Sequence, residues 1–180
     1  MPASTRAEKM EKRKAQYELY QRYYKAMYNT ALRIVNNTAE AEDIMQNSFL
    51  DAFSKLNTWS GTGTFGSWLK RIVVNNALDT VRAQKEFMSL AEEEPEIIPD
   101  NNNDDNETEA RVEEIRDAMK QLGKEDRIIL SLFLFEGYDH EEISGILNIS
   151  YNAARTRYSR ARQKLCNLLK AQQTPKHNFN

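Results

Sequence analysis

A short basic segment near the C-terminus carries side chains suited to binding a phosphodiester backbone. Residues 151–165, YNAARTRYSRARQKL, hold five basic side chains and no acidic one. A charged, solvated helix normally places acids three or four positions from its bases, and this segment has none. Arginine and lysine bind phosphates, whereas small polar side chains reach base edges. The segment therefore predicts a helix that contacts DNA.

A helical projection divides this segment into a packing side and a contact side. Apolar residues at offsets of three and four form one stripe: Tyr151, Ala154, Tyr158, Ala161, Leu165 and Leu168. The opposite side has small polar residues in the middle and cations at its margins: Asn152, Thr156, Ser159 and Gln163 between Arg155 and Arg162 on one edge and Arg157, Arg160 and Lys164 on the other. A contact helix built in this way could read bases and bind both phosphate backbones.

The residues before this helix complete a helix-turn-helix outline. Asp139 followed by Glu142 is a capping-box spacing, which predicts the start of a short helix ending near Leu147. Asn148 tolerates a left-handed backbone, and Ser150 is placed to cap the contact helix. In this motif the second helix enters the major groove.

A second combination suited to nucleic acid lies between residues 59 and 82. The segment WSGTGTFGSW, 59–68, places glycines and hydroxyl residues between two tryptophans and predicts a mobile loop leading into a helix over 65–85. One narrow stripe of that helix combines aromatic, cationic and amide groups: Trp68, Arg71, Asn75 and Arg82. Such groups stack on bases and hold phosphates of single strands, although a tryptophan here also fits an ordinary core position.

A third feature is an apolar residue on a polar helix face. The helix expected from Asn37 or Thr38 to about Leu56 has a regular core stripe: Ala41, Met45, Phe49, Ala52 and Leu56. Another side of it gathers Asp43, Gln46, Asn47 and Leu50. Leu50 among polar neighbours indicates a contact surface, and the alternative is an ordinary solvated face.

The elements that position these groups are all predicted to be helices. Apolar periodicity predicts helices over 15–36, 38–56 and 65–85, and again from Val112 to the C-terminal part, with Gly123 and Gly137 as stops. Between them, residues 86–110 hold ten acids and no Lys or Arg, with prolines and an Asn/Asp run, which predicts a flexible linker. We therefore expect an all-α fold of two small helical domains, the second a helix-turn-helix domain.

The net charge hides how basic these two domains are. The chain has 27 acids against 25 Lys and Arg, a formal charge of -2, but ten of the acids lie in the linker. Residues 1–85 and 111–172 are thus both basic, as a nucleic-acid-binding protein requires. Residues 173–180 are expected to form a disordered tail.

Three motifs together resemble a known family, the extracytoplasmic-function (ECF) group of RNA polymerase sigma factors. AEDIMQNSFLDAF is similar to its polymerase-binding helix at Asp43, Gln46 and Phe49. FGSWLKRIVVNNALD is similar to the segment that follows in its second region, and EEISGILNISYNAARTRYSRARQKL is similar to its fourth region. The resemblance covers about residues 15–85 and 110–170.

This resemblance implies a role for each group of residues. Core polymerase would be bound by Asp43, Gln46, Asn47, Leu50 and Phe53. The minus-10 element would be captured and opened by Trp59, Ser60, Gly61, Thr62, Thr64, Trp68, Arg71, Asn75 and Arg82. The minus-35 element would be bound by Asn152, Arg155, Thr156 and Ser159 at the bases and by Arg157, Arg160 and Lys164 at phosphates. An anti-sigma factor is a further implied partner, and the acidic linker would either thread the RNA-exit path of the polymerase or act as a plain spacer.

Other classes of protein remain as alternatives to this interpretation. A stand-alone helix-turn-helix regulator would use residues 1–85 for sensing or dimerisation, and an adaptor that titrates a sigma factor would not need the arginine-rich helix. No phosphate-binding glycine loop, nucleophile set or metal spacing indicates an enzyme, a metal or a cofactor. The longest apolar run, residues 128–135, is too short to span a bilayer, so we expect a cytoplasmic protein.

Overall fold

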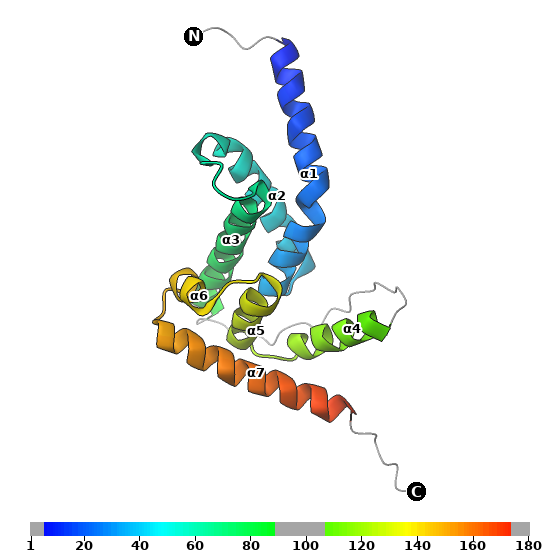
Figure 1. Cartoon of the computed structure of the whole chain (residues 1–180), viewed down its shortest axis with the longest axis vertical. Coiled ribbons are helices and arrows are strands. Elements are labelled where there is room, and N and C mark those ends of the chain that lie inside the picture. The colour runs from blue at the N-terminus through cyan, green and yellow to red at the C-terminus, as the bar shows by residue number, and fades with distance from the viewer. Residues whose placement is uncertain (1–5, 89–106, 174–180) are drawn as a thin grey trace, which may run out of the picture. The chain divides into compact units, whose positions relative to one another are not determined.

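The described part of the chain forms two compact helical units. A computed structural model describes residues 6–88 and 107–173, and the chain divides into units of residues 1–92 and 93–180 (Figure 1). Within the described residues every regular element is a helix, which confirms the predicted all-α fold. The predicted tail beyond Gln173 lies outside the described residues.

The first unit is a bundle of three helices. It consists of α1 (Arg6–Val35), α2 (Thr38–Ser54), a 3₁₀ turn (Leu56–Thr58) and α3 (Phe65–Met88). Its core contains the predicted apolar stripes, with these residues among the most buried: Met27, Ala31, Ile34, Ala41, Met45, Phe49, Ala52, Phe65, Leu69 and Val73. The first helix begins earlier than the predicted residue 15, because the preceding Ala, Glu, Lys and Arg residues favour a helix without any apolar periodicity.

Polar side chains set the start of α2 and its alignment with α3. Asn36 is left-handed, with φ of 55°, and the Asn37 side chain accepts a hydrogen bond from the Glu40 backbone N–H at 3.0 Å, as its sequence position predicts. Asn76 of α3 donates to the Ser48 hydroxyl at 3.0 Å and to the Asp51 carboxylate at 3.3 Å. These bonds hold the outward faces of α2 and α3 in one fixed relation.

The second unit contains the predicted helix-turn-helix. Its elements are α4 (Glu107–Lys120), α5 (Lys124–Leu130), a π-helical turn (Ser131–Phe135), α6 (His140–Leu147) and α7 (Tyr151–Gln173). Its core is made of residues from all the later elements, including Leu130, Leu132, Ile143, Ala154 and Ala161, each fully buried. The buried helix predicted before Gly137 is present, but its last part widens into the π turn.

The turn between α6 and α7 has the predicted local structure. Asp139 accepts from the Glu142 backbone N–H at 2.8 Å, and Glu142 accepts from the Asp139 backbone N–H at 2.9 Å, which completes the capping box. Asn148 is left-handed, with φ of 53°, and the Ser150 hydroxyl accepts from the Ala153 N–H at 3.2 Å. The two helices of the motif are therefore joined at a defined geometry.

Replacing Asp139 with alanine should destabilise the second unit by about 1 kcal/mol, because the Glu142 backbone N–H in the first turn of α6 loses its side-chain acceptor. Urea unfolding followed by circular dichroism would measure this loss. The matched control is Glu141→Ala, which removes an acid from the same helical turn but leaves the capping box intact. An equal shift in both variants would mean that helix-dipole charge, and not the cap, is responsible.

The predicted linker between the two units is helical at both of its ends. The helix α3 continues to Met88 and α4 begins at Glu107, so each extends into residues 86–110, the predicted linker. The remainder of that prediction, residues 89–106, lies outside the described residues.

Candidate nucleic-acid interface

The outward face of α7 presents the predicted base-reading side chains to solvent. Asn152, Arg155, Thr156 and Ser159 are all exposed, whereas Ala154 on the other side is fully buried. With Arg160, these four residues line an open hollow of about 520 Å³ on the helix surface. The structure thus joins Arg160, predicted as a phosphate ligand, to the residues predicted to read bases.

The inner face of α7 is held by an aromatic cluster that includes a histidine. The Tyr158 ring lies 4.2 Å from that of Phe133 and 5.1 Å from that of His140, measured between centroids. His140 also stacks on Phe133 at 4.9 Å. Tyr151, predicted on the buried stripe, is 49% exposed because it stands at the start of the helix, where α6 covers only one edge.

Tyr151 has a role that the apolar pattern did not indicate. The Arg155 guanidinium carbon lies 5.8 Å from the centroid of its ring, within the range of a cation–π interaction. This contact restricts the rotamers of Arg155 at the edge of the hollow. A spacing of four residues on one helix could have indicated the pair.

One predicted phosphate ligand is bound to an acid of another helix. The Lys164 ammonium lies 2.5 Å from the carboxylate of Asp126 in α5. Arg157 and Arg160 occupy exposed positions of α7. Asp126 is 38 positions away in the chain, so no helical spacing indicated it. The cationic margin of α7 is therefore partly neutralised at its C-terminal end.

In the first unit, the loop before α3 is exposed and shaped by two glycines. Gly61 and Gly63 have φ of 73° and 85°, a left-handed backbone that favours glycine. The hydroxyls of Ser60 and Thr62 are hydrogen-bonded at 2.6 Å, and the Thr64 hydroxyl caps α3 by accepting from the Ser67 N–H at 3.1 Å. All the predicted minus-10 residues between 60 and 64 are thus on the surface.

The two tryptophans at the ends of this loop pack on each other. The rings of Trp59 and Trp68 are stacked with centroids 6.4 Å apart, and Phe65 lies 5.8 Å from Trp59 and 5.7 Å from Trp68. Both tryptophans are half-buried, so Trp68 is neither a core aromatic nor a free base platform. The pair anchors the loop while leaving part of each ring accessible.

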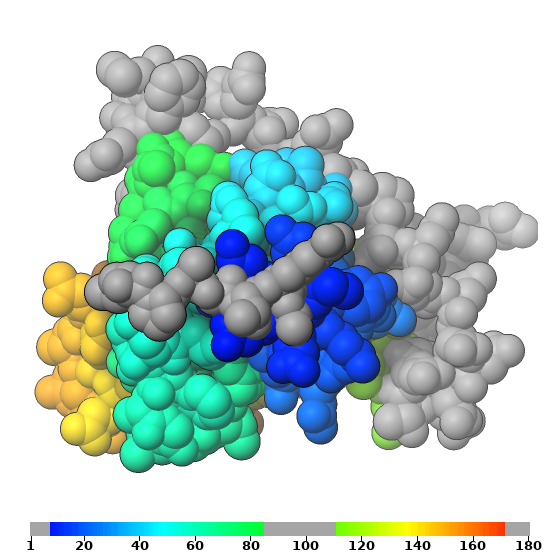
Figure 2. All heavy atoms as spheres, turned by 90° about the horizontal axis from the view of Figure 1, so that it is seen from above, coloured from blue at the N-terminus to red at the C-terminus, as the bar shows by residue number. Residues whose placement is uncertain are grey.

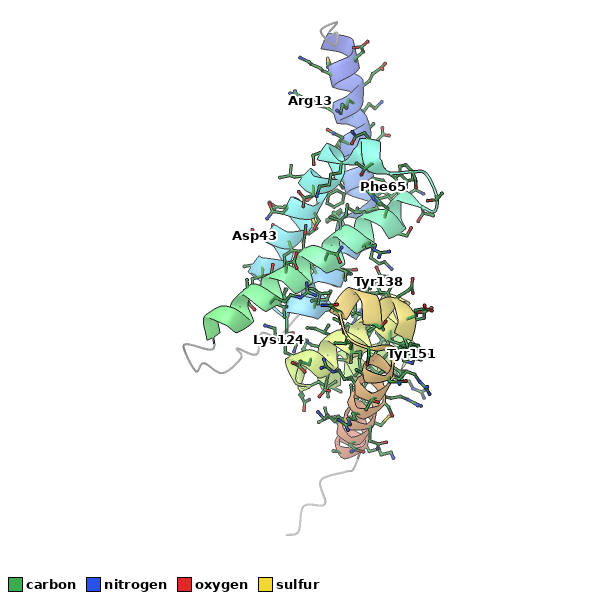
Figure 3. All side chains as sticks on the ribbon, turned by 90° about the vertical axis from the view of Figure 1, so that its left-hand side faces the viewer. Arg13, Asp43, Phe65, Lys124, Tyr138 and Tyr151 are labelled. Atoms are coloured by element: carbon green, nitrogen blue, oxygen red, sulfur yellow. The ribbon has the colours of Figure 1, made fainter. Side chains whose placement is uncertain are left out.

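The three polar members of the predicted α3 stripe are exposed, but the last of them forms an ion pair. Arg71 and Asn75 are exposed, and Arg82 forms an ion pair of 2.8 Å with Asp79 one turn away. Arg82 is therefore less available to a phosphate than Arg71. Figure 3 shows the side chains of this helix together with those of α2.

The polar face of α2 also lies on the surface. Asp43, Gln46 and Asn47 are exposed, and Leu50 among them is 67% exposed, a large fraction for a leucine. The fifth predicted residue of this group, Phe53, is half-buried, and its ring centroid lies 5.8 Å from that of Phe49. Four of the five residues thus form one continuous exposed face, which we call the α2 face.

Comparison with known proteins identifies the family. The family described as Sigma-70 region 2 matches residues 19–87, and Sigma-70, region 4 matches residues 112–165. RNA polymerase sigma factor CarQ of Myxococcus xanthus is 31% identical over 152 residues, which cover 84% of this chain and 87% of CarQ. ECF RNA polymerase sigma factor SigE of Mycolicibacterium smegmatis is 31% identical over 82% of this chain and 59% of its own length. The chain belongs to the ECF group of RNA polymerase sigma factors.

The fold of this ECF sigma factor is that of a solved relative. Sigma factor RpoE of Bartonella quintana, solved with the anti-sigma factor NepR, shares the fold with a TM-score of 0.62 at 20% identity, covering 86% of this chain and 96% of RpoE. As a sigma factor, the protein binds core RNA polymerase and promoter DNA and initiates transcription. A stand-alone regulator is not favoured, because both sigma regions are present in order.

The described residues include neither a metal-binding cluster nor a membrane-spanning helix. Over residues 6–88 and 107–173, no cluster of His, Cys, Asp and Glu could hold a metal ion. Within those same ranges, no helix is long and apolar enough to cross a membrane.

Proposed function

We propose that the two units divide promoter recognition between them, with the contact helix α7 reading the minus-35 element. The observation that carries this assignment is the hollow lined by Asn152, Arg155, Thr156, Ser159 and Arg160 on the exposed face of a helix-turn-helix recognition helix. Arginine forms bidentate bonds to guanine and hydroxyls bond to several bases, so the side chains around the hollow can discriminate sequences. Arg157 flanks it and contacts a phosphate, and Lys164 at the same margin can contact another once it leaves Asp126.

Residues 1–85 act as the domain that binds core polymerase and the minus-10 element. The α2 face is the polymerase contact, because Leu50 would bury an exposed apolar side chain there while Asp43, Gln46 and Asn47 supply polar partners. Phe53 supports this face from the core side through Phe49.

The loop of residues 59–64 captures a base flipped from the opened minus-10 element. Its hydroxyls and backbone are exposed, its ends are anchored by Trp59 and Trp68, and Arg71, Asn75 and Arg82 lie on α3 beyond it. Unstacking a base costs a few kcal/mol, and a preformed loop offsets part of this cost. No bond-making step is involved, so the protein acts as an initiation factor and not as an enzyme.

Further partners and the site of action follow from the family. Sigma factor RpoE was solved in complex with an anti-sigma factor, and we expect this chain to be held inactive by such a protein as well. The acidic residues 86–110 either occupy the RNA-exit path or act as a spacer between the domains. The protein works where the genome is, in the cytoplasm.

Transcription in vitro from genomic DNA, with purified core polymerase and the full-length protein, tests this function directly. Start sites that depend on both components should share one minus-35 and one minus-10 sequence at a fixed spacing. The absence of any start site that requires the protein would refute the assignment of the α2 face, the loop and α7 together.

Replacing Asp126 with asparagine should strengthen promoter binding. The change releases the Lys164 ammonium, which can then neutralise one more phosphate, so the slope of log affinity against log salt should steepen by about 0.9. A titration of holoenzyme with a promoter fragment at several KCl concentrations measures this slope. Asp117→Asn is the control, because Asp117 pairs with Lys120 on α4 and not with α7. An unchanged slope for Asp126→Asn would mean that breaking the ion pair with Asp126 adds no phosphate contact by Lys164.

A further inference from the structure

The N-terminal part of α1 is not covered by the sigma factor match. That match begins at residue 19, whereas α1 begins at Arg6. Figures 1 and 3 both show the helix continuing past the end of the bundle where α2 and α3 are connected, and Arg13 lies beyond Phe65, the first residue of α3. None of the contacts assigned above uses this projecting end.

The side of α1 that packs into the bundle continues along the projecting end as a basic stripe. Met27, Ala31 and Ile34 are buried against α2 and α3 and follow one another at spacings of four and three. The same spacing, continued toward the N-terminus, reaches Arg13 and Lys9, because residues three or four apart share one side of a helix. The stripe is therefore apolar inside the bundle and cationic beyond it.

One side of the projecting end carries three exposed cations. Lys12 lies next to Lys9 and Arg13. Glu8 lies at the margin of this side, four positions before Lys12, and the acids Glu11 and Glu18 lie on the opposite side of the helix. Lys9, Lys12 and Arg13 are all exposed. Within residues 6–88 and 107–173, none of these three cations forms an ion pair. We call these three residues the α1 stripe.

The α1 stripe overhangs the same end of the unit as the loop of residues 59–64. Tyr23 marks the level of this end: its ring lies 5.7 Å from Phe65, and a Cβ added to Gly66 would stand only 2.7 Å from it. A helix rises about 1.5 Å per residue, so Arg13 lies about 15 Å and Lys9 about 21 Å farther out. Figure 2 looks onto this end and shows the blue residues of α1 beside the turquoise residues near position 60.

We propose that the α1 stripe binds phosphates of the promoter DNA, a few nucleotides from the base captured by the loop of residues 59–64. The inference rests on the proposed role of that loop. The stripe faces the side on which the loop lies, its three residues are all cations, and Glu11 and Glu18 lie on the opposite side of the helix. Exposed lysine and arginine at helical spacing bind a phosphate backbone without regard to sequence.

The test uses holoenzyme reconstituted from core polymerase and full-length protein, with a fluorescent promoter fragment taken from a start site mapped by transcription of genomic DNA. The variant is Lys9→Ala with Arg13→Ala. Its matched control is Lys14→Ala with Lys25→Ala, which removes two exposed cations from the opposite side of α1. Affinity is measured over a series of KCl concentrations, and binding to core polymerase without DNA is measured separately.

Loss of two phosphate contacts should reduce the slope of log affinity against log salt by about 1.4 to 1.8 and weaken binding about 5- to 50-fold near 0.1 M salt. The control pair should behave as the unaltered protein. Unchanged DNA binding, or an equal loss in both pairs, would overturn the inference alone. Weaker binding of the Lys9→Ala, Arg13→Ala variant to core polymerase without DNA would also overturn it, because the stripe would then be a polymerase contact. If no start site depends on the unaltered protein, the proposed function fails and this inference with it.

Discussion

Replacing Leu50 with aspartate should weaken binding to core RNA polymerase about 30- to 1000-fold, the range of a loss of 2–4 kcal/mol at an interface hot spot. Leu50 is 67% exposed in the free protein, so the substitution leaves the bundle core intact. In the complex, the new carboxylate would be desolvated without a partner, on a face that already carries the negative charge of Asp43. Titration of labelled protein with core polymerase measures the affinity.

Met10→Asp is the matched control for Leu50→Asp. Met10 is 64% exposed and also lies on a helix of the first unit, but outside the α2 face. The affinity of the Met10→Asp variant for core polymerase, measured without DNA, should stay within about two-fold of the affinity of the unaltered protein. This is the expectation for a surface residue away from the interface. If Leu50→Asp bound equally well, the α2 face would be an ordinary solvated surface.

Replacing Arg155 with alanine should cost about 1–3 kcal/mol of promoter binding and remove the preference for one base of the minus-35 element. Arg155 lines the hollow of α7 and is oriented by the ring of Tyr151, so its loss removes a positioned base contact. Transcription from a set of promoters with every base at each minus-35 position measures the preference.

Arg157→Ala provides the comparison that separates base reading from phosphate binding. Arg157 is an equally exposed arginine of α7 that does not line the hollow. Its loss should weaken all promoters alike and lower the salt slope by about 0.9, with the base preferences unchanged. If the two variants showed the same pattern, Arg155 would be a phosphate ligand only.

The local features of this chain were predictable because they depend on neighbouring residues. The capping box of Asp139 and Glu142, the left-handed Asn148 and the cap at Asn37 all follow from spacings of a few positions, where the chain itself holds the partners together. The same holds for the two sides of α7, since an α-helix converts a spacing of three or four into a shared face.

Partnerships between distant segments were not predictable in the same way. The pairing of Lys164 with Asp126, the stacking of Trp59 on Trp68 across the loop and the partial burial of Phe53 each depend on how separate elements pack. A helical projection describes one element at a time. It therefore predicted Lys164 to be available to phosphates, and it could not distinguish a core position from a base-stacking position for Trp68.

Helix periodicity and capping are local properties. The helical content of the chain, the location of its two basic parts and the polar and cationic faces of its helices could therefore be predicted from the order of residues alone. Which of those groups are available to a partner depends instead on the packing of helices against one another. Exposure of Leu50, neutralisation of Lys164 and the position of Arg13 beyond the loop end all arise when helices distant in sequence pack on one another. Burial and pairing depend on that packing, so they cannot be predicted from the spacing of residues along one helix.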